Sequence, residues 1–276
     1  MKDDDIDGGR EFDWGRTSEE YAAYRQGYPP AFYAMLQALG IGTPEQRILD
    51  LGTGTGVLAR AFAGNGATVV GVDVADNQIA QARRLAEEQG LEAIFSVCAA
   101  EDIDFADASF DVVSAAQAWM YFDVEVVIPK ILRVLTESGQ LVLTYFSWLP
   151  FKDATARQSE ALVLRYNPGW SGANYTGYLP RMFPWAKGVF DLKSFHVAEV
   201  AVPFTRDGWR GRLRACRGVG AELTQAEIER FDAEHAQLLA EIVAEEFTIL
   251  HQMSVHAYVR KGALWPDKSK HPDFKL

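Results

Sequence analysis

Apolar runs of strand length alternate with stretches of helical periodicity through the first half of the chain. The apolar runs cover residues 47–51, 67–72, 93–97, 110–114 and 140–146. The helical stretches between them cover residues 58–63, 77–89 and 124–135. This alternation predicts βαβ units, and therefore an α/β fold with a doubly wound, mostly parallel sheet that has helices on both faces.

The pattern changes after Phe146. Residues 148–187 are rich in aromatic side chains, Gly and Pro, and we expect them to form an inserted cap. Strands are expected again at residues 194–202 and 247–259. Between these strands, a capping box formed by Thr224 and Glu227 predicts the start of a helix that runs to about residue 244.

The charge balance argues against a nucleic-acid partner. The chain has 27 Lys and Arg against 38 Asp and Glu, a formal net charge of -11, whereas binding a phosphate backbone needs a dense field of cations. The clearest cluster of cations, at residues 206–217, is interpreted as a solvated helix face. Cys98 and Cys216 cannot build a disulfide framework, and nothing near them has metal-ligand spacing, so no metal site is expected.

The chain gives no sign of a membrane or secretory segment. Its longest apolar runs are too short to span a bilayer, and its acidic start differs from the basic region of a signal peptide. We therefore expect a reduced, cytoplasmic protein with no membrane partner.

A glycine-rich loop, Asp50-Leu-Gly-Thr-Gly-Thr-Gly56, joins a predicted strand to a predicted helix. Glycines at such a junction allow a tight turn, and the free N–H groups of the following helix suit a nucleotide-like ligand. A dinucleotide fingerprint does not fit, because its first matching glycine, Gly54, lies two residues too far from the strand and Asp50 would face the pyrophosphate. Asp50 instead suits a cationic amine, and Asp73, about 20 residues beyond the loop, suits a ribose diol. A ribose and a cationic amine without a pyrophosphate describe S-adenosylmethionine.

Four motifs in this region resemble those of the class I S-adenosylmethionine-dependent methyltransferases, of the type 11 or ubiquinone-methyltransferase-like kind. They are the glycine loop, Gly71-Val-Asp73, Ala100-Glu-Asp102 and Ser109-Phe-Asp-Val-Val113. The resemblance implies a seven-stranded sheet whose last strand is antiparallel. It also implies N-terminal lid helices and a cofactor-binding core, which precede the cap, the last two strands with intervening helices, and a polar tail. Their expected bounds are 1–45, 46–147, 148–187, 188–260 and 261–276.

The same resemblance assigns the methionine and ribose ends of the cofactor site to named positions. Gly52, Gly54 and Gly56 would line the methionine moiety, and Thr53 belongs to the same cofactor-binding loop. The remaining positions are Asp50 near the amino group, Asp73 on the ribose hydroxyls, and Gln117 at the methionine end.

The adenine end is assigned in the same way. The expected neighbours of the base are Val74 and Gln78 beside it, Ala100 and Glu101 at its edge, and Ile103 at its face. Many relatives have an acidic residue where this chain has Ala99. Either Glu101 or Asp102 substitutes for that residue, or the contact with the adenine amino group is absent.

The N-terminal segment carries a second resemblance. Tyr21, Arg25, Tyr28 and Pro29 match a Y-x-x-x-R-x-x-Y-P pattern found before the core in a subset of small-molecule methyltransferases. This implies a lid in which Arg25 binds the cofactor carboxylate and a tyrosine lies near the sulfonium. The alternative is that the tyrosines pack on the core while the arginine is solvated.

Aromatic side chains are the candidates for an acceptor site. Trp119 and Tyr121 follow the fourth predicted strand, and Trp148, Trp170 and Tyr175 lie in the expected cap. Each could equally be a core residue, and the cap aromatics could instead form the subunit interface of a homo-oligomer.

Two residues are candidates for a general base. His251, in the last predicted strand, is the first candidate, and Tyr28 is the second. The alternative for His251 is a structural histidine whose hydrogen bonds are satisfied.

Together these features predict an enzyme that transfers a methyl group from S-adenosylmethionine to an O, N or C nucleophile of a small metabolite. In-line displacement would depend mainly on orientation of the acceptor. The chain lacks the Asn/Asp-Pro-Pro-Tyr/Phe sequence of amino-methyltransferases, which again argues against nucleic acid. The alternatives are a non-catalytic cofactor-binding or interaction protein and a nicotinamide-dependent oxidoreductase.

Overall fold

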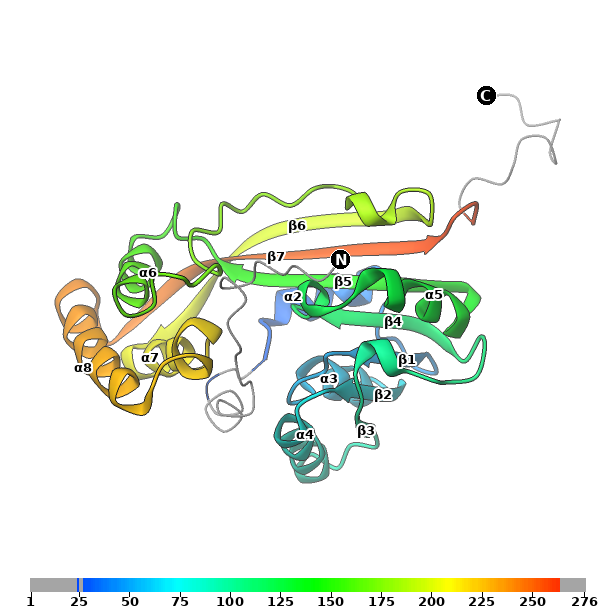
Figure 1. Ribbon diagram of the computed structural model, residues 1–276, viewed down its shortest axis with the longest axis horizontal. Helices are drawn as coiled ribbons and strands as arrows, with labels where there is room; N and C mark the ends of the chain where they lie inside the picture. The colour runs from blue at the N-terminus through cyan, green and yellow to red at the C-terminus, as the bar shows by residue number, and fades with distance from the viewer. Residues whose placement is uncertain (1–23, 25–26, 264–276) are drawn as a thin grey trace.

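Strand β1 (Arg47–Leu51) lies inside the sheet and pairs in parallel with β2 (Thr68–Asp73) and β4 (Phe110–Ala116). The parallel part is extended by β3 (Ile94–Val97), which pairs with β2, and by β5 (Leu135–Trp148), which pairs with β4. The computed structural model describes residue 24 and residues 27–263 (Figure 1). Parts of the expected lid and tail therefore lie outside the described residues.

The other edge of the sheet consists of two long strands. Strand β7 (Glu246–Arg260) runs antiparallel to β5 on one side and to β6 (Phe190–Thr205) on the other. The strand order is β3-β2-β1-β4-β5-β7-β6. This confirms the predicted seven-stranded, mostly parallel α/β sheet with an antiparallel last strand.

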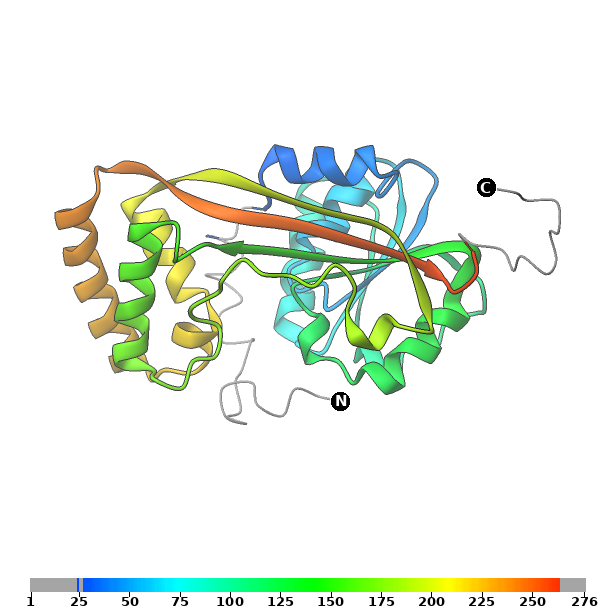
Figure 2. The same ribbon diagram turned by 90° about the horizontal axis from the view of Figure 1, so that it is seen from above.

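Alternate side chains of the central strands enter two separate hydrophobic cores. Leu49 and Leu51 of β1 pack on the face covered by α5 (Val124–Val134), whereas Ile48 packs on the opposite face. Figure 2 shows the core with helices on both sides of the sheet. The helices of the second face are α2 (Pro30–Ala38), α3 (Val57–Gly64) and α4 (Asp76–Glu88). Burial on both faces explains why these strands are almost continuously apolar in sequence.

A helical bundle lies beyond the core, at the far end of β5, β6 and β7 (Figures 1 and 2). It consists of α6 (Ala154–Tyr166), α7 (Arg206–Arg214) and α8 (Gln225–Ile242), which pack around a third hydrophobic cluster. The capping box that opens α8 at Thr224 is confirmed. The expected cap of residues 148–187 supplies only α6, because α7 and α8 enter the bundle from the later segment. None of the helices described is both long and apolar enough to cross a membrane.

The cationic cluster of α7 is not a solvated face. Arg210 and Arg214, four residues apart, both bind Asp232 of α8, the second through Nη1 at 2.6 Å. Arg212 is only 7% exposed, and Arg217, in the π-helical turn Arg217–Ala221, is 8% exposed. The interpretation of a solvated face is wrong because α7 packs between elements that are distant in sequence.

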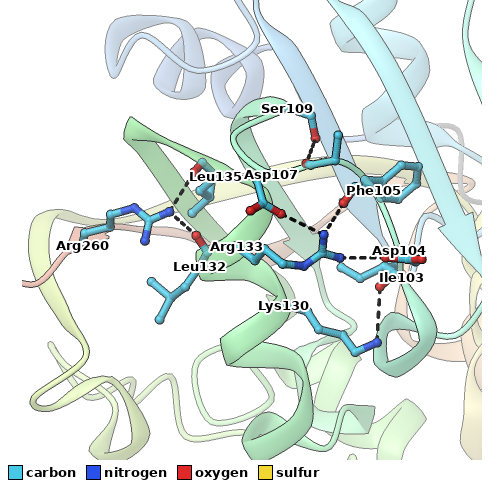
Figure 3. A network of polar contacts seen from close by, with 11 residues as sticks. Ile103, Asp104, Phe105, Asp107, Ser109, Lys130, Leu132, Arg133, Leu135 and Arg260 are labelled. Atoms are coloured by element: carbon cyan, nitrogen blue, oxygen red, sulfur yellow. Dashed lines mark hydrogen bonds and ion pairs between the residues drawn. The ribbon is translucent and has the colours of Figure 1, made fainter.

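A network of polar contacts ties the loop before β4 to the end of α5 (Figure 3). The Arg133 guanidinium donates to the Phe105 carbonyl oxygen at 2.5 Å and forms ion pairs of 3.1 Å with Asp104 and Asp107. Arg260 of β7 donates to the carbonyl oxygens of Leu132 and Leu135, at the end of the helix where backbone carbonyls lack intrahelical partners. The loop that follows Ala100–Asp102, one of the four motifs, is therefore held in place.

Candidate functional site

The glycine loop forms the turn between β1 and α3. Gly52, Gly54 and Gly56 have φ values of 63°, 54° and 73°, a backbone region that favours glycine. A Cβ added at Gly52 would lie 2.5 Å from the Ala118 Cβ, and one at Gly56 would lie 2.9 Å from the Phe95 ring. At Gly54 the nearest atom would be Gln78 Oε1 at 3.8 Å, so this side of the loop has room for an approaching group.

Asp50 lies at the end of β1, beneath the loop. It is 2% exposed, and its two carboxylate oxygens accept hydrogen bonds from Ser114 Oγ at 2.6 Å and Thr53 Oγ1 at 2.7 Å. Burial raises the pKa of Asp50 to about 6, although both hydrogen bonds act in the opposite direction. A buried carboxylate of this kind is stabilised when a cation binds nearby.

Asp73, at the end of β2, holds the glycine loop directly. Its Oδ2 accepts from the Gly54 amide at 2.8 Å, and its Oδ1 accepts from the Ala75 amide at 3.0 Å. Burial raises the pKa of Asp73, and these backbone hydrogen bonds oppose that effect. The carboxylate predicted for ribose binding therefore lies beside the loop predicted for methionine binding.

The residues expected around the adenine differ in exposure. Val74 is 67% exposed, whereas Gln78 is 3%, Ala100 is 4% and Ile103 is 0% exposed. Glu101 accepts a hydrogen bond from the Asp123 amide at 2.7 Å, which joins it to the start of α5. Asp102 ends the short 3-10 helix that carries Ala100 and Glu101.

A cavity of about 650 Å³ extends from the glycine loop to α7. Its loop end is lined by Asp50, Gly52, Thr53 and Gln117, all of which were predicted for the cofactor. Both candidate bases, Tyr28 and His251, also line this cavity. Its volume lies within the usual range of about 300–1,000 Å³ for small-molecule sites.

His251 lies in a stack of aromatic rings on one wall of the cavity. Its ring stacks on Phe146 with a centroid distance of 4.7 Å and on Phe204 at 5.9 Å. The edges of Trp148 and Trp209 approach it at 6.4 Å and 6.3 Å. Its Nδ1 lies 3.0 Å from the Ile249 carbonyl oxygen, and because a carbonyl can only accept, Nδ1 carries the proton. The neutral ring therefore has its lone pair on Nε2.

The aromatic residues predicted for the acceptor lie elsewhere. Trp119 packs on Trp185 in the core with a centroid distance of 4.6 Å. In the bundle, the indole nitrogen of Trp148 donates to Glu160 at 2.5 Å, and Trp170 is 6% exposed. The remaining two are Tyr175, which donates to Gln252 Oε1 at 2.6 Å, and Tyr121, which accepts from Arg217. None of these five is among the described residues that line the cavity.

Tyr21 and Arg25, the expected lid residues, lie outside the described residues. Within the part of the chain that the structure describes, no group of three or more His, Cys, Asp or Glu side chains is arranged to hold a metal ion.

Sequence reasoning missed the residues that line the α7 end of the cavity. These include Phe146, Phe204, Thr205, Arg212 and Phe247. One local signal was available, because Thr205 accepts a hydrogen bond from the Gly208 amide at 3.0 Å and is the N-cap of α7. Recognising that cap would have extended the strand beyond residue 202 and placed Phe204 next to the helix.

Comparison with known proteins relates the core of the chain to methyltransferases. Residues 49–143 match the methyltransferase domain family. A demethylmenaquinone methyltransferase of Thermus thermophilus is 41% identical over 111 residues, which make up 39% of this chain and 50% of that protein. YcgJ of Bacillus subtilis, an uncharacterized methyltransferase, is 35% identical over 101 residues, 36% of this chain and 40% of that protein. The matches span half or less of these curated relatives.

Solved structures resemble the chain over a longer stretch. The crystal structure of YcgJ has a TM-score of 0.53 at 20% identity, covering 84% of this chain and 99% of that one. A phosphoethanolamine N-methyltransferase of Haemonchus contortus, solved with phosphomonomethylethanolamine and S-adenosylhomocysteine, has a TM-score of 0.52 at 22% identity. That similarity covers 94% of this chain and 58% of the other. At these identities the similarity establishes the fold.

Proposed function

We propose that this chain, which belongs to the class I S-adenosylmethionine-dependent methyltransferases, transfers a methyl group to an O, N or C nucleophile of a small molecule. The observation that carries the proposal is the single cavity that joins the buried Asp50 and the glycine loop to a wall of aromatic rings. A cofactor bound at the loop end would leave the α7 end for an acceptor.

The residues present suit S-adenosylmethionine. Asp50 offers a buried negative charge to the cofactor ammonium group, and Asp73 is close enough to the loop to bind the ribose hydroxyls as well. The open side of Gly54 leaves room for close approach to the backbone. The Haemonchus contortus enzyme, solved with S-adenosylhomocysteine, supports the proposal through its similar fold.

Methyl transfer requires little from the protein beyond orientation of the acceptor nucleophile. The bound cofactor supplies an activated methyl carbon on its sulfonium. The walls of the cavity would align the nucleophile with that carbon and exclude water, and orientation of this kind supplies about 7–11 kcal/mol in well-oriented intramolecular reactions. An acceptor that must lose a proton would transfer it to His251 Nε2, with Tyr28 as the second candidate.

The proposal also assigns a role to each region of the chain. We assign cofactor binding to the core of residues 46–147, a lid to residues 1–45, and the acceptor side to the cap of residues 148–187 together with α7 and α8. The net charge of -11 supports a small-molecule acceptor over nucleic acid. A cytoplasmic location and a homo-oligomeric state stay predictions.

Calorimetric titration with S-adenosylmethionine and S-adenosylhomocysteine tests the proposal. We expect binding to the wild type and at least a tenfold loss in Asp73→Ala. Asp111→Ala is the matched control, because Asp111 pairs with Arg47, and Arg47 lies at the start of β1 whereas the glycine loop follows its end. Absence of binding to the wild type, or equal losses in the two variants, would refute it. Fluorescence quenching by a reduced nicotinamide cofactor would instead favour an oxidoreductase.

A further inference from the structure

The carboxylate of Asp50 is held between hydroxyl groups from two other parts of the chain. In the register of the sheet, Asp50 lies opposite Ser114 of β4 on one side and opposite Gly71 of β2 on the other. Ser114 Oγ donates to Asp50 Oδ1 at 2.6 Å, and Thr53 Oγ1 donates to Oδ2 at 2.7 Å. A Cβ added at Gly71 would lie 2.8 Å from Thr53 Oγ1, so the glycine leaves the space that this hydroxyl occupies. Strands β1, β2 and β4 therefore act together to position one carboxylate.

Both hydroxyl groups recognise the ionised form of Asp50. An ionised carboxylate only accepts hydrogen bonds, so each of its oxygens is bound here by one O–H donor. A protonated Asp50 is itself a donor, and one of the two hydroxyl groups would have to turn from donor to acceptor. Ser114 is 0% exposed and Asp50 is 2% exposed, and hydrogen bonds to a charged group are stronger in such a dry environment than in water. The two hydroxyl groups therefore stabilise the carboxylate over the carboxylic acid.

The ionisation of Asp50 depends on a balance of opposing effects. Burial has the largest effect and raises the pKa of Asp50, and the negative charge of Asp73 at the end of β2 acts in the same direction. The hydrogen bond from Ser114 lowers this pKa, the bond from Thr53 lowers it less, and the resulting value is about 6. Asp50 is thus ionised at pH 7, and removal of one hydroxyl group would bring its pKa closer to neutral pH.

Asp50 and Ser114 differ in their access to a ligand. Asp50 and Thr53 line the cavity, whereas Ser114 is not among the described residues that line it. The carboxylate has about four lone-pair positions, and the two hydroxyl groups occupy two of them. The others are left for a cationic group that enters the cavity. Ser114 can therefore affect such a ligand through Asp50 and not by direct contact.

From this arrangement we infer that Ser114 is a positioning residue of the cofactor site, whose hydroxyl group keeps Asp50 as a carboxylate for the cofactor ammonium group. Cofactor binding is then coupled to proton release. Where Asp50 is protonated, its proton leaves to solvent and the carboxylate pairs with the incoming ammonium group. The observed affinity is independent of pH while Asp50 is ionised, and below its pKa the affinity falls by up to about tenfold per pH unit. The inference rests on the proposed function, which assigns the ammonium group to Asp50.

Calorimetric titration with S-adenosylhomocysteine between about pH 5 and pH 8 tests the inference, in buffers of different ionisation enthalpy that report the protons released. For the wild type we expect a constant affinity well above pH 6, and weaker binding with proton release below it. The ligand 5′-methylthioadenosine, which lacks the amino-acid group, should bind without this pH dependence.

The variant Ser114→Ala should move the pH profile and leave the affinity at high pH nearly unchanged. We expect the fall in affinity to begin about one pH unit higher, so that binding is roughly eightfold weaker than in the wild type at pH 5.5 and within about threefold at pH 8. Ser254→Ala is the matched control, because Ser254 is also 0% exposed but lies on β7, which β5 separates from β4. Its profile should be that of the wild type.

Two further variants decide the question if Ser114→Ala does not fold. Thr53→Val removes the other hydroxyl group and should shift the profile in the same direction. Asp50→Asn should bind S-adenosylhomocysteine weakly and without pH dependence. A pH dependence that persists in Asp50→Asn would belong to other titratable residues of the cavity, which among the described residues are Tyr24, Tyr28, Arg212, Glu246 and His251.

The outcomes separate this inference from the proposed function. Failure of S-adenosylhomocysteine to bind the wild type at any pH counts against the proposed function. The inference itself is overturned if S-adenosylhomocysteine binds with the same affinity throughout the pH range, or if 5′-methylthioadenosine shows the same pH dependence. It is also overturned if the pH dependence persists in Asp50→Asn, or if Ser114→Ala and Ser254→Ala have the same profile.

Discussion

The Arg217 guanidinium donates a hydrogen bond to the hydroxyl of Tyr121 at 3.1 Å and thereby joins the helical bundle to the core. Tyr121 belongs to the short 3-10 helix Trp119–Tyr121 that follows β4, only four residues after the cavity-lining Gln117. Arg217 also donates to Ser171 Oγ at 3.0 Å, within the segment that follows α6. One buried cation therefore connects three parts of the chain around the site.

Tyr121→Phe removes the bond across this junction. We expect the free energy of unfolding to fall by about 1.5 kcal/mol, since Arg217 loses an acceptor while buried. Amide hydrogen exchange should accelerate in the π-helical turn at 217–221. Tyr166→Phe is the matched control, because Tyr166 donates to the carboxylate of Glu234 at 2.6 Å within the bundle alone. If hydrogen exchange at residues 217–221 accelerates equally in both variants, the bond between Tyr121 and Arg217 has no more effect on this turn than a bond within the bundle.

Two glycines of the loop should respond differently to the same substitution. Gly52→Ala places a Cβ 2.5 Å from Ala118 Cβ at a φ of 63°, so we expect a stability loss of about 3 kcal/mol from overpacking and backbone strain. Gly54→Ala meets nothing closer than 3.8 Å, so strain of about 1 kcal/mol is its main cost. Its added methyl should nevertheless weaken cofactor binding at least tenfold. Urea unfolding and calorimetry measure the two effects, and unchanged binding by Gly54→Ala would contradict the assigned role of the loop.

Asp50 should make folding stability depend on pH. Its pKa is about 6 in the folded protein against an ordinary value of 3.8, so between these values the folded state binds more protons than the unfolded state. The stability that this difference contributes is fully present below about pH 4 and is lost as pH rises to 6. At 1.36 kcal/mol per pKa unit, the free energy of unfolding falls by about 3 kcal/mol over this range. Asp50→Asn removes this dependence, so its stability relative to wild type should rise with pH in unfolding experiments at pH 4 to 7.

Asp111→Asn is a control in which the stability contributed by the carboxylate changes with pH in the opposite direction. Its hydrogen bonds with Arg47 lower the pKa of Asp111, so this carboxylate stabilises the fold above the unfolded pKa and loses that contribution as pH falls. The stability of Asp111→Asn relative to wild type should therefore decrease as pH rises to about 4 and stay nearly constant from there to pH 7. If relative stability depends on pH in the same way for the two variants, the pKa of Asp50 is not raised by burial in the folded protein.

The parts of the molecule that sequence predicted well are those whose causes are local. The turn between β1 and α3 needs glycines at positions with positive φ, and Asp73 bonds to that turn from the next strand. The alternation of strand and helix patterns in the sequence was sufficient to predict the mostly parallel sheet. In each case the residues that determine the structure lie within about one βαβ unit of one another.

The α7 end of the cavity depends on contacts that no local pattern contains. The arginines of α7 were interpreted as solvated because their partners are distant in the sequence: Asp232 lies in α8 and Trp148 at the end of β5. Aromatic composition was equally uninformative, since Trp119 packs in the core while Phe204 lines the cavity. An aromatic side chain suits both environments, so only the tertiary packing decides between them.

His251→Asn tests the proposed base. The asparagine side-chain nitrogen can replace Nδ1 as donor to the Ile249 carbonyl, but no group replaces Nε2. For a phenolic acceptor we expect kcat to fall by about 10²–10⁴-fold, the usual contribution of a general base, with unchanged affinity for S-adenosylhomocysteine. His256→Asn, on the same strand but outside the cavity, should leave kcat near the wild-type value because His256 binds the Pro180 carbonyl oxygen. If the two variants have equal kcat values, His251 is a structural residue of the aromatic stack and the proton is removed by another group, with Tyr28→Phe the next variant to measure.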